Sequence, residues 1–160
     1  MEPAPCLVLI DDDRAWLEAV AGFLRGKRLE VYTASDAASG FTLLELIRPH
    51  VVLFDGHLPD MEGLEFLRRL RARRPNLTTL IVSADDQAKA ALSARARAFV
   101  CKSASPLVVL RTIELSLNAD SARTQNDAYR QGTPCLTVLI SSPTYLPVPF
   151  ASSRIPFRNN

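Results

Sequence analysis

Polar and charged residues that suit phosphate chemistry stand at the ends of short apolar runs. These residues are Asp11, Asp12, Asp55, Ser83 and Lys102. Neighbouring carboxylates repel one another unless a cation joins them, and oxygen-only ligands suit Mg²⁺, which commonly works with a phosphate. Lysine offers a compact positive charge to a phosphate oxygen, and a carboxylate can itself form an aspartyl-phosphate. Together these residue types predict a magnesium-assisted phosphoryl-transfer site.

The apolar runs alternate with stretches of helical spacing, and this alternation decides where the polar residues must meet. Strand-like runs occupy residues 6–10, 29–34, 51–54, 80–82 and 98–101, and helical spacing follows in 14–25, after Asp36, in 63–73, in 86–97 and from Pro106. Continuous apolar strands that alternate with helices are typical of a parallel sheet covered on both faces. We therefore predict a three-layer α/β domain in which the carboxyl ends of the strands share one edge.

Composition favours a single cytoplasmic domain without a membrane partner. The chain has 160 residues, of which 48% are hydrophobic, and a formal net charge of +2. No apolar stretch approaches the roughly 20 residues that a membrane-spanning helix needs. The three cysteines, Cys6, Cys101 and Cys135, form no C-x-x-C pair. We therefore expect a reducing environment and neither a zinc site nor a disulfide framework.

Residues 121–160 break the pattern and hold five of the eleven prolines. We expect residues 1–120 to form the domain and residues 121–160 to be a Pro-rich tail without a recognisable effector domain. Three interpretations of the tail stay open. It is disordered, or residues 136–140 form a strand that docks on the sheet edge or a partner, or the chain has lost its original carboxyl-terminal domain by a frameshift.

In this order and at strand ends, the site residues resemble the receiver domain of bacterial two-component response regulators over about residues 5–118. The most specific match is DGHLPDMEG at residues 55–63, with a proline four residues and a glycine eight residues after Asp55. The resemblance implies a five-stranded parallel sheet of flavodoxin-like topology with strand order 2-1-3-4-5, followed by an irregular tail.

The resemblance also implies a role for each residue of the site. Asp55 would accept a phosphoryl group from a sensor histidine kinase or a phosphotransfer protein, as part of a phosphorelay. Lys102 would hold a phosphate oxygen. Asp12 and Asp55 would bind Mg²⁺ directly with the backbone carbonyl of His57, and Asp11 would act through a bound water. Such a protein is no enzyme apart from its own magnesium-dependent phosphorylation and dephosphorylation.

Two further residues would pass the signal on. Ser83 would move toward the phosphoryl group, and Phe99 would rotate with it. The implied output is binding to a downstream protein partner, with a homodimer on phosphorylation as a further form. We expect neither a membrane partner nor direct contact with DNA.

Two departures from the family pattern affect the signalling surface more than the chemistry. Ser103 stands where the family usually has proline after the lysine, so we expect no cis peptide there, because cis bonds are mostly confined to proline. The interval from Ser83 to Lys102 is shorter than the family's by about one helical turn. The shortening falls in the alanine-rich helix at 86–97.

Other interpretations of the same residues stay open. A degenerate receiver would bind partners without phosphorylation. A phosphatase with an aspartate nucleophile would need a second acid two residues after Asp55, where His57 stands. Asp13 is interpreted as the cap of the following helix, since aspartate is a good N-cap. We interpret the arginines at 68, 69, 71, 73 and 74 as a solvated helix face, although basic faces also attract nucleic acid.

Overall fold

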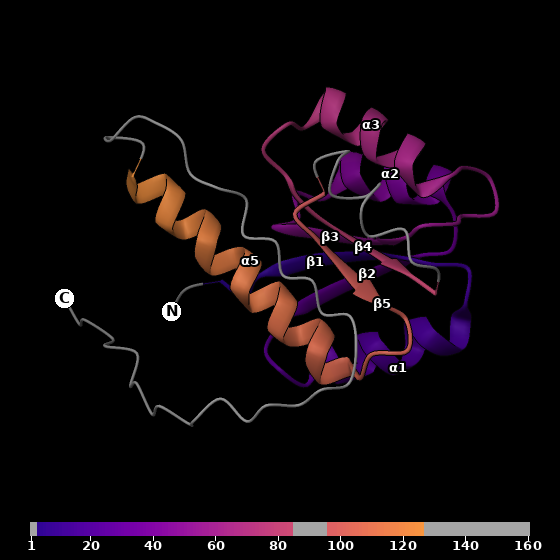
Figure 1. Ribbon diagram of the computed structural model, residues 1–160, viewed down its shortest axis with the longest axis horizontal. Coiled ribbons are helices and arrows are strands. Elements are labelled where there is room, and N and C mark those ends of the chain that lie inside the picture. The colour runs from indigo at the N-terminus through magenta and orange to yellow at the C-terminus, as the bar shows by residue number, and fades with distance from the viewer. Residues whose placement is uncertain (1–2, 85–95, 127–160) are drawn as a thin grey trace.

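The computed structural model describes residues 3–84 and 96–126, and in these residues a helix follows every strand except the fourth (Figure 1). The elements are β1 Cys6–Ile10, α1 Arg14–Arg25, β2 Glu30–Ala34, α2 Ala37–Leu46, β3 Val51–Asp55, α3 Gly63–Arg73, β4 Thr78–Ser83, β5 Ala98–Cys101 and α5 Pro106–Asn126. The helix predicted at 86–97 lies almost entirely outside the described residues, as does the strand predicted at 136–140. Helix α5 continues past residue 120, where we expected the tail to begin. A helix that crosses this position does not by itself locate the end of the domain, and the domain boundary stays a prediction.

The five strands form one parallel sheet in the order β2-β1-β3-β4-β5, as predicted. From β1 the chain first crosses to β2 on one side and later returns to β3 on the other. The direction of winding therefore reverses between β1 and β3. Ligands of open α/β sheets bind at such a reversal, outside the carboxyl ends of the strands.

Burial follows the position of each strand in the sheet. Every residue of β1, β3 and β4 is buried, whereas the edge strands β2 and β5 contain partly or fully exposed residues. Helices α1 and α5 cover one face of the sheet and α2 and α3 cover the other (Figure 1). No helix in the described part of the chain is long and apolar enough to cross a membrane.

Alternate residues of each central strand belong to two separate hydrophobic cores. Leu7 and Leu9 of β1 face the core under α1 and α5, whereas Val8 and Ile10 face the core under α2 and α3. Successive side chains of a strand point to opposite faces, so a continuous apolar run supplies both cores at once. This two-sided burial holds the strands in register and thus fixes where their polar ends lie.

Carboxylates begin the first two helices. Asp13 caps α1, and its side chain accepts a hydrogen bond from the Trp16 N–H at 3.0 Å, which confirms the predicted cap. Asp36 caps α2 in the same way, and the Ser39 N–H that it accepts lowers the pKa of its carboxyl. Asp60, from the loop after β3, accepts from the first two N–H groups of α2, those of Ala37 and Ala38, at 2.8 and 2.9 Å. That loop is therefore tied to α2 at its N-terminus.

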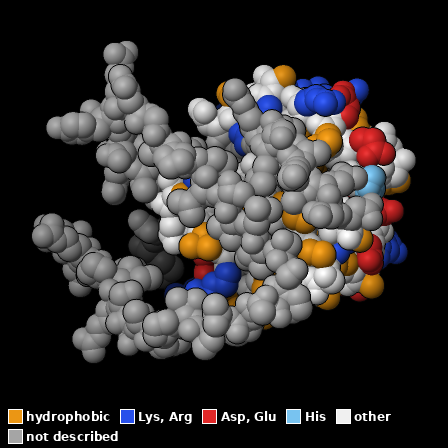
Figure 2. All heavy atoms as spheres, in the orientation of Figure 1, with side chains coloured by type: hydrophobic (Ala, Val, Ile, Leu, Met, Phe, Trp, Pro, Cys, Tyr) orange, Lys and Arg blue, Asp and Glu red, His pale blue; other side chains and the backbone are white. Residues whose placement is uncertain are grey.

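The arginine group on and after α3 is only partly the solvated face that we expected. Arg68 and Arg69 are exposed and pair with an acidic side chain of the same helix, and basic and acidic side chains lie together over α3 in Figure 2. The expectation of a solvated face is wrong for Arg71 and Arg74. Arg71 donates to two carbonyls of the loop before β4 and to Thr79, and Arg74 donates to carbonyls at the end of α2. These two arginines bind the polypeptide itself.

Gly63 provides a test of how closely α3 must approach the end of β3. A Cβ at Gly63 would lie 2.6 Å from the Asp55 carbonyl oxygen and 2.8 Å from the Gly56 Cα. Because both neighbours are backbone atoms, Gly63→Ala should lower the free energy of unfolding by about 1–3 kcal/mol in urea titrations. Gly22, on the exposed side of α1, has no atom within 4 Å of its added Cβ. Gly22→Ala should therefore stabilise by about 0.5–1 kcal/mol, and equal effects at the two sites would contradict the close approach.

Candidate phosphoryl-transfer site

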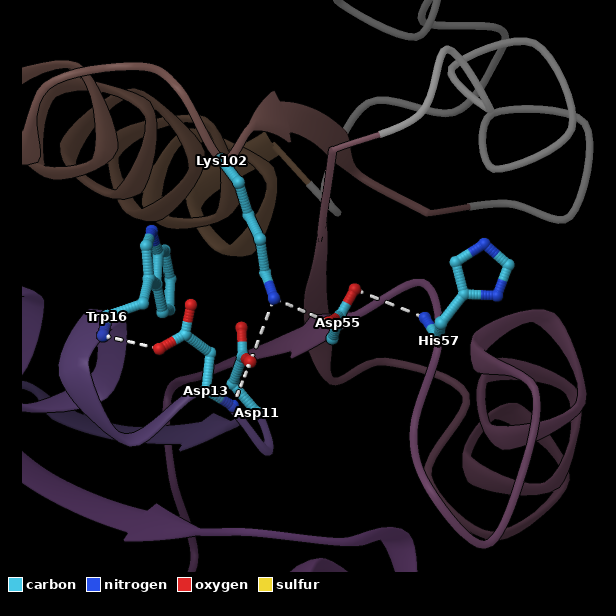
Figure 3. A network of polar contacts seen from close by, with 6 residues as sticks. All are labelled: Asp11, Asp13, Trp16, Asp55, His57 and Lys102. Carbon is cyan, nitrogen blue, oxygen red and sulfur yellow. Dashed lines mark hydrogen bonds and ion pairs between the residues drawn. The ribbon is translucent and has the colours of Figure 1, made fainter.

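The structure brings the polar residues at the strand ends to one edge of the sheet (Figure 3). Asp55 and Ser83 are the last residues of β3 and β4, and Asp11 and Lys102 directly follow β1 and β5. Backbone bonds extend the ladder beyond the strands, because the Lys102 N–H donates to the Ser83 carbonyl at 3.0 Å. The ends of four neighbouring strands are thus held in register at the site.

Asp11 is a fully buried carboxylate with one oxygen bound and the other unbound. Its Oδ1 accepts the Asp13 N–H at 2.9 Å and the Lys102 ammonium at 2.9 Å. Its Oδ2 is buried and has no hydrogen-bond partner in the described part of the chain. Burial raises the pKa of the Asp11 carboxyl above its ordinary value, although Lys102 and the Asp13 N–H act in the opposite direction. An unsatisfied oxygen at this position is costly unless a further donor or cation reaches it.

Lys102 bridges the two buried carboxylates of the site. Its Nζ lies 2.9 Å from Asp11 Oδ1 and 2.6 Å from Asp55 Oδ2, and its side chain is only 18% exposed. Burial alone would lower the pKa of Lys102, but the hydrogen bonds and charges of the two carboxylates outweigh burial and raise it. The lysine is therefore charged at neutral pH and holds the ends of β1, β3 and β5 together.

Asp55 has both of its oxygens engaged, on opposite sides. Oδ2 accepts from Lys102, and Oδ1 accepts the backbone N–H of His57 at 3.1 Å. The imidazole of His57 points away from Asp55 (Figure 3) and contacts the Glu62 carboxylate at 3.1 Å. Within the site, His57 thus contacts Asp55 through its backbone, and a metal-binding role for its carbonyl stays a prediction.

Three carboxylates gather beside the lysine. Asp11, Asp12 and Asp55 each offer one oxygen, and these oxygens all lie within 4.8 Å of one another. Asp11 and Asp55 are buried, whereas Asp12 is exposed, so the group opens to solvent on the Asp12 side. Three carboxylates beside one ammonium leave excess negative charge, and hard oxygen donors of this kind suit Mg²⁺.

The two predicted switch residues lie on neighbouring strands. Ser83 is buried at the end of β4, and Phe99 of β5 is partly buried against the core under α2 and α3. Ser83 is paired in register with Cys101, so Phe99 lies two residues back from that level on β5. Their movement stays a prediction, and residues 85–95 between them are not described. No peptide bond among the described residues is cis, as expected from Ser103.

Trp16 belongs to the site, although sequence reasoning did not select it. Its ring centroid lies 5.9 Å from the Lys102 ammonium, and the indole stands beside that ammonium in Figure 3. The sequence feature that could have identified Trp16 is its position in the first turn of the helix that Asp13 caps. A first-turn residue next to the acidic pair must lie near the carboxyl edge of the sheet.

Known proteins share the fold and the sequence pattern of this chain. A family model for the response regulator receiver domain matches residues 7–114. The probable transcriptional regulatory protein TcrX of Mycobacterium tuberculosis is 38% identical over 85 residues, which cover 53% of this chain and 36% of TcrX. The transcriptional activator protein ExaE of Pseudomonas putida is 35% identical over 113 residues, which cover 67% of this chain and 52% of ExaE. The chain thus spans about a third to a half of these curated relatives.

Solved structures agree with this match. A CheY-like response regulator receiver domain protein from Methanospirillum hungatei superposes with a TM-score of 0.71 at 28% identity, covering 75% of this chain and 98% of that one. The chemotaxis response regulator CheY4 of Vibrio cholerae gives a TM-score of 0.66 at 20% identity over 71% of this chain and 98% of its own. The second likeness bears on the fold alone.

Substitution of Lys102 should show how much the lysine contributes to the stability of the fold that buries Asp11 and Asp55. Lys102→Met leaves two buried carboxylates without their cation, so the free energy of unfolding should fall by about 3 kcal/mol in metal-free buffer. In the double variant with Asp11→Asn, the loss should be at least about 1 kcal/mol smaller than the sum of the single losses. The control is Lys27→Met, since Lys27 is an exposed lysine beyond the end of α1. Strictly additive losses would show that Lys102 and Asp11 do not stabilise one another.

Proposed function

Since this chain belongs to the response regulator receiver domain family, we propose that Asp55 accepts a phosphoryl group from a histidine kinase or a phosphotransfer protein. One observation carries the proposal. The carboxylate of Asp55 ends a central strand beside two further aspartates and one lysine, at the edge where parallel sheets bind ligands. The cluster combines a nucleophile, a cation and further oxygen ligands, which are the parts that phosphoryl transfer needs.

The proposed reaction is a displacement at phosphorus. A carboxylate oxygen of Asp55 attacks the phosphorus of a phosphohistidine and forms an O–P bond while the N–P bond breaks. The electron pair of the broken bond stays on the imidazole nitrogen of the donor. Lys102, already bonded to Asp55 Oδ2, then holds a phosphoryl oxygen, where its charge offsets the negative charge of the transferred group.

The carboxylates fit a magnesium ion. Asp12 and Asp55 would hold it directly with the backbone carbonyl of His57, and Asp11 would act through a bound water. The fit rests on three hard oxygen donors within 4.8 Å and on the buried Oδ2 of Asp11, which has no hydrogen-bond partner among the described residues. When bound, the ion supplies positive charge against the phosphoryl oxygens. The protein itself contributes the spacing of the ligands and the orientation of Asp55.

The proposed output is a change of surface that a protein partner reads. Ser83 would turn toward the phosphoryl group and Phe99 would follow, which favours a state already present in the unphosphorylated protein. A homodimer formed on phosphorylation is part of the same proposal. TcrX and ExaE are transcriptional regulators by name, but the matched region covers only 36% and 52% of them. We therefore assign no DNA contact to this domain.

Phosphorylation should be visible directly by intact-mass spectrometry. With Mg²⁺ and acetyl phosphate as donor, the protein should gain the mass of one phosphoryl group, while acetate leaves with the electron pair of the broken O–P bond. The adduct should be absent without Mg²⁺ and in Asp55→Ala, and present in Asp13→Asn, which alters a neighbouring carboxylate outside the proposed ligand set. No adduct on the wild-type protein would exclude the acceptor role and favour a receiver that binds without phosphorylation.

Magnesium binding should be visible without phosphorylation, as a rise in thermal stability. A ligand at about tenfold its Kd should stabilise the folded state by about 1.4 kcal/mol. Wild type and Asp13→Asn should both show the rise, because asparagine preserves the N-cap. Asp12→Asn makes the same charge change one residue away and should largely lose the response. An equal response in Asp12→Asn and Asp13→Asn would mean that the ion acts by general screening.

A further inference from the structure

The single tryptophan of the chain lies beside the residues that would handle the phosphoryl group. Trp16 is in the first turn of α1, and its backbone N–H donates to the capping carboxylate of Asp13 at 3.0 Å. Its indole is partly buried and packs against the core under α1 and α5. The backbone and ring of Trp16 are therefore held by contacts that do not involve the catalytic lysine.

In the part of the chain that the structure describes, two carboxylate bonds use two of the three donors of the lysine ammonium. An ammonium carries three N–H groups, and those of Lys102 include one bond to Asp11 and one to Asp55. The Trp16 ring centroid is 5.9 Å from Nζ, within the range at which the negative face of an indole attracts a cation. In Figure 3 the ammonium lies between Trp16 on one side and Asp55 on the other.

We propose that Trp16 is a positioning residue for Lys102, and that its indole face keeps the ammonium beside Asp55. A lysine side chain has a flexible four-carbon stem and many rotamers. The bonds to Asp11 and Asp55 restrict these rotamers only as long as both carboxylates can accept from the ammonium. The ring adds a third restraint on the α1 side. The consequence for phosphoryl transfer rests on the proposed function, whereas the contact itself does not.

The kind of contact matters once Asp55 carries a phosphoryl group. The ammonium must then shift from a carboxylate oxygen to a phosphoryl oxygen. A hydrogen-bond acceptor in the place of Trp16 would compete for the ammonium at a fixed point. The attraction of an aromatic face is broader in direction, so it allows a small shift while still opposing a swing into solvent. Trp16 thus restrains Lys102 without binding it in one geometry.

The contact can be tested by fluorescence, independently of phosphorylation. Because Trp16 is the only tryptophan, its emission reports on the charge next to the indole. Lys102→Met should shift the emission maximum of the folded protein relative to wild type. Lys27→Met removes a lysine that lies over Phe23, beyond the far end of α1, and should leave the emission unchanged. Identical emission in wild type and Lys102→Met would overturn the proposed contact.

The positioning role can be tested with two substitutions at Trp16. Trp16→Leu keeps apolar packing but removes the aromatic face, and Trp16→Phe restores a face. At saturating acetyl phosphate and Mg²⁺, Trp16→Leu should transfer the phosphoryl group about fivefold more slowly, with the half-saturating donor concentration unchanged. Trp16→Phe should return to within about twofold of wild type. Thermal unfolding checks that both variants are folded.

The outcomes separate the positioning role from the function on which it rests. Equal slowing in the leucine and phenylalanine variants would mean that packing, and not the aromatic face, is required, and would overturn the proposal. No slowing in Trp16→Leu would overturn it as well. If the wild-type protein takes up no phosphoryl group, the proposed function fails, while the emission of Lys102→Met still decides whether Trp16 contacts the lysine.

Discussion

The bridge from Lys102 to Asp11 and Asp55 is the interaction on which the site depends. It joins carboxylates at the ends of two buried central strands to an ammonium that follows an edge strand. Buried carboxylates without a cation are strongly unfavourable, so the ammonium is required wherever these aspartates are ionised. The same bond places a positive charge beside the proposed acceptor oxygen. The contact that makes the buried acids tolerable is thus also the contact that phosphoryl transfer would use.

The rest of the fold keeps the Asp55 end of β3 in place. The two cores hold the central strands in register, and Gly63 lets α3 approach the backbone of Asp55 and Gly56. Asp60 ties the loop between β3 and α3 to the N-terminus of α2. Each contact fixes the backbone near Asp55 without occupying its carboxylate. A rigid backbone that holds the Asp55 carboxylate at the edge of the sheet is the arrangement that transfer to this residue would need.

Charged residues elsewhere in the domain show why residue type alone does not reveal a role. Arg71 and Arg74 lie in the same basic sequence as Arg68 and Arg69, yet the first two bind backbone carbonyls and the others lie in solvent. Asp13 stands beside Asp12 but turns to cap α1. In each case the neighbouring backbone, and not the side chain itself, decides whether a charge serves the site, the fold or the solvent.

The sequence by itself determined the order of elements, the parallel sheet, the cap at Asp13 and the edge to which the polar residues belong. These features follow from local periodicity and from polar residues at the ends of apolar runs. Only the tertiary structure decided which oxygen of Asp11 meets Lys102, which arginines are tied to the backbone, and that Trp16 faces the ammonium. Lys102 and Asp11 are 91 positions apart, and such contacts depend on helix packing and side-chain direction that no local pattern records.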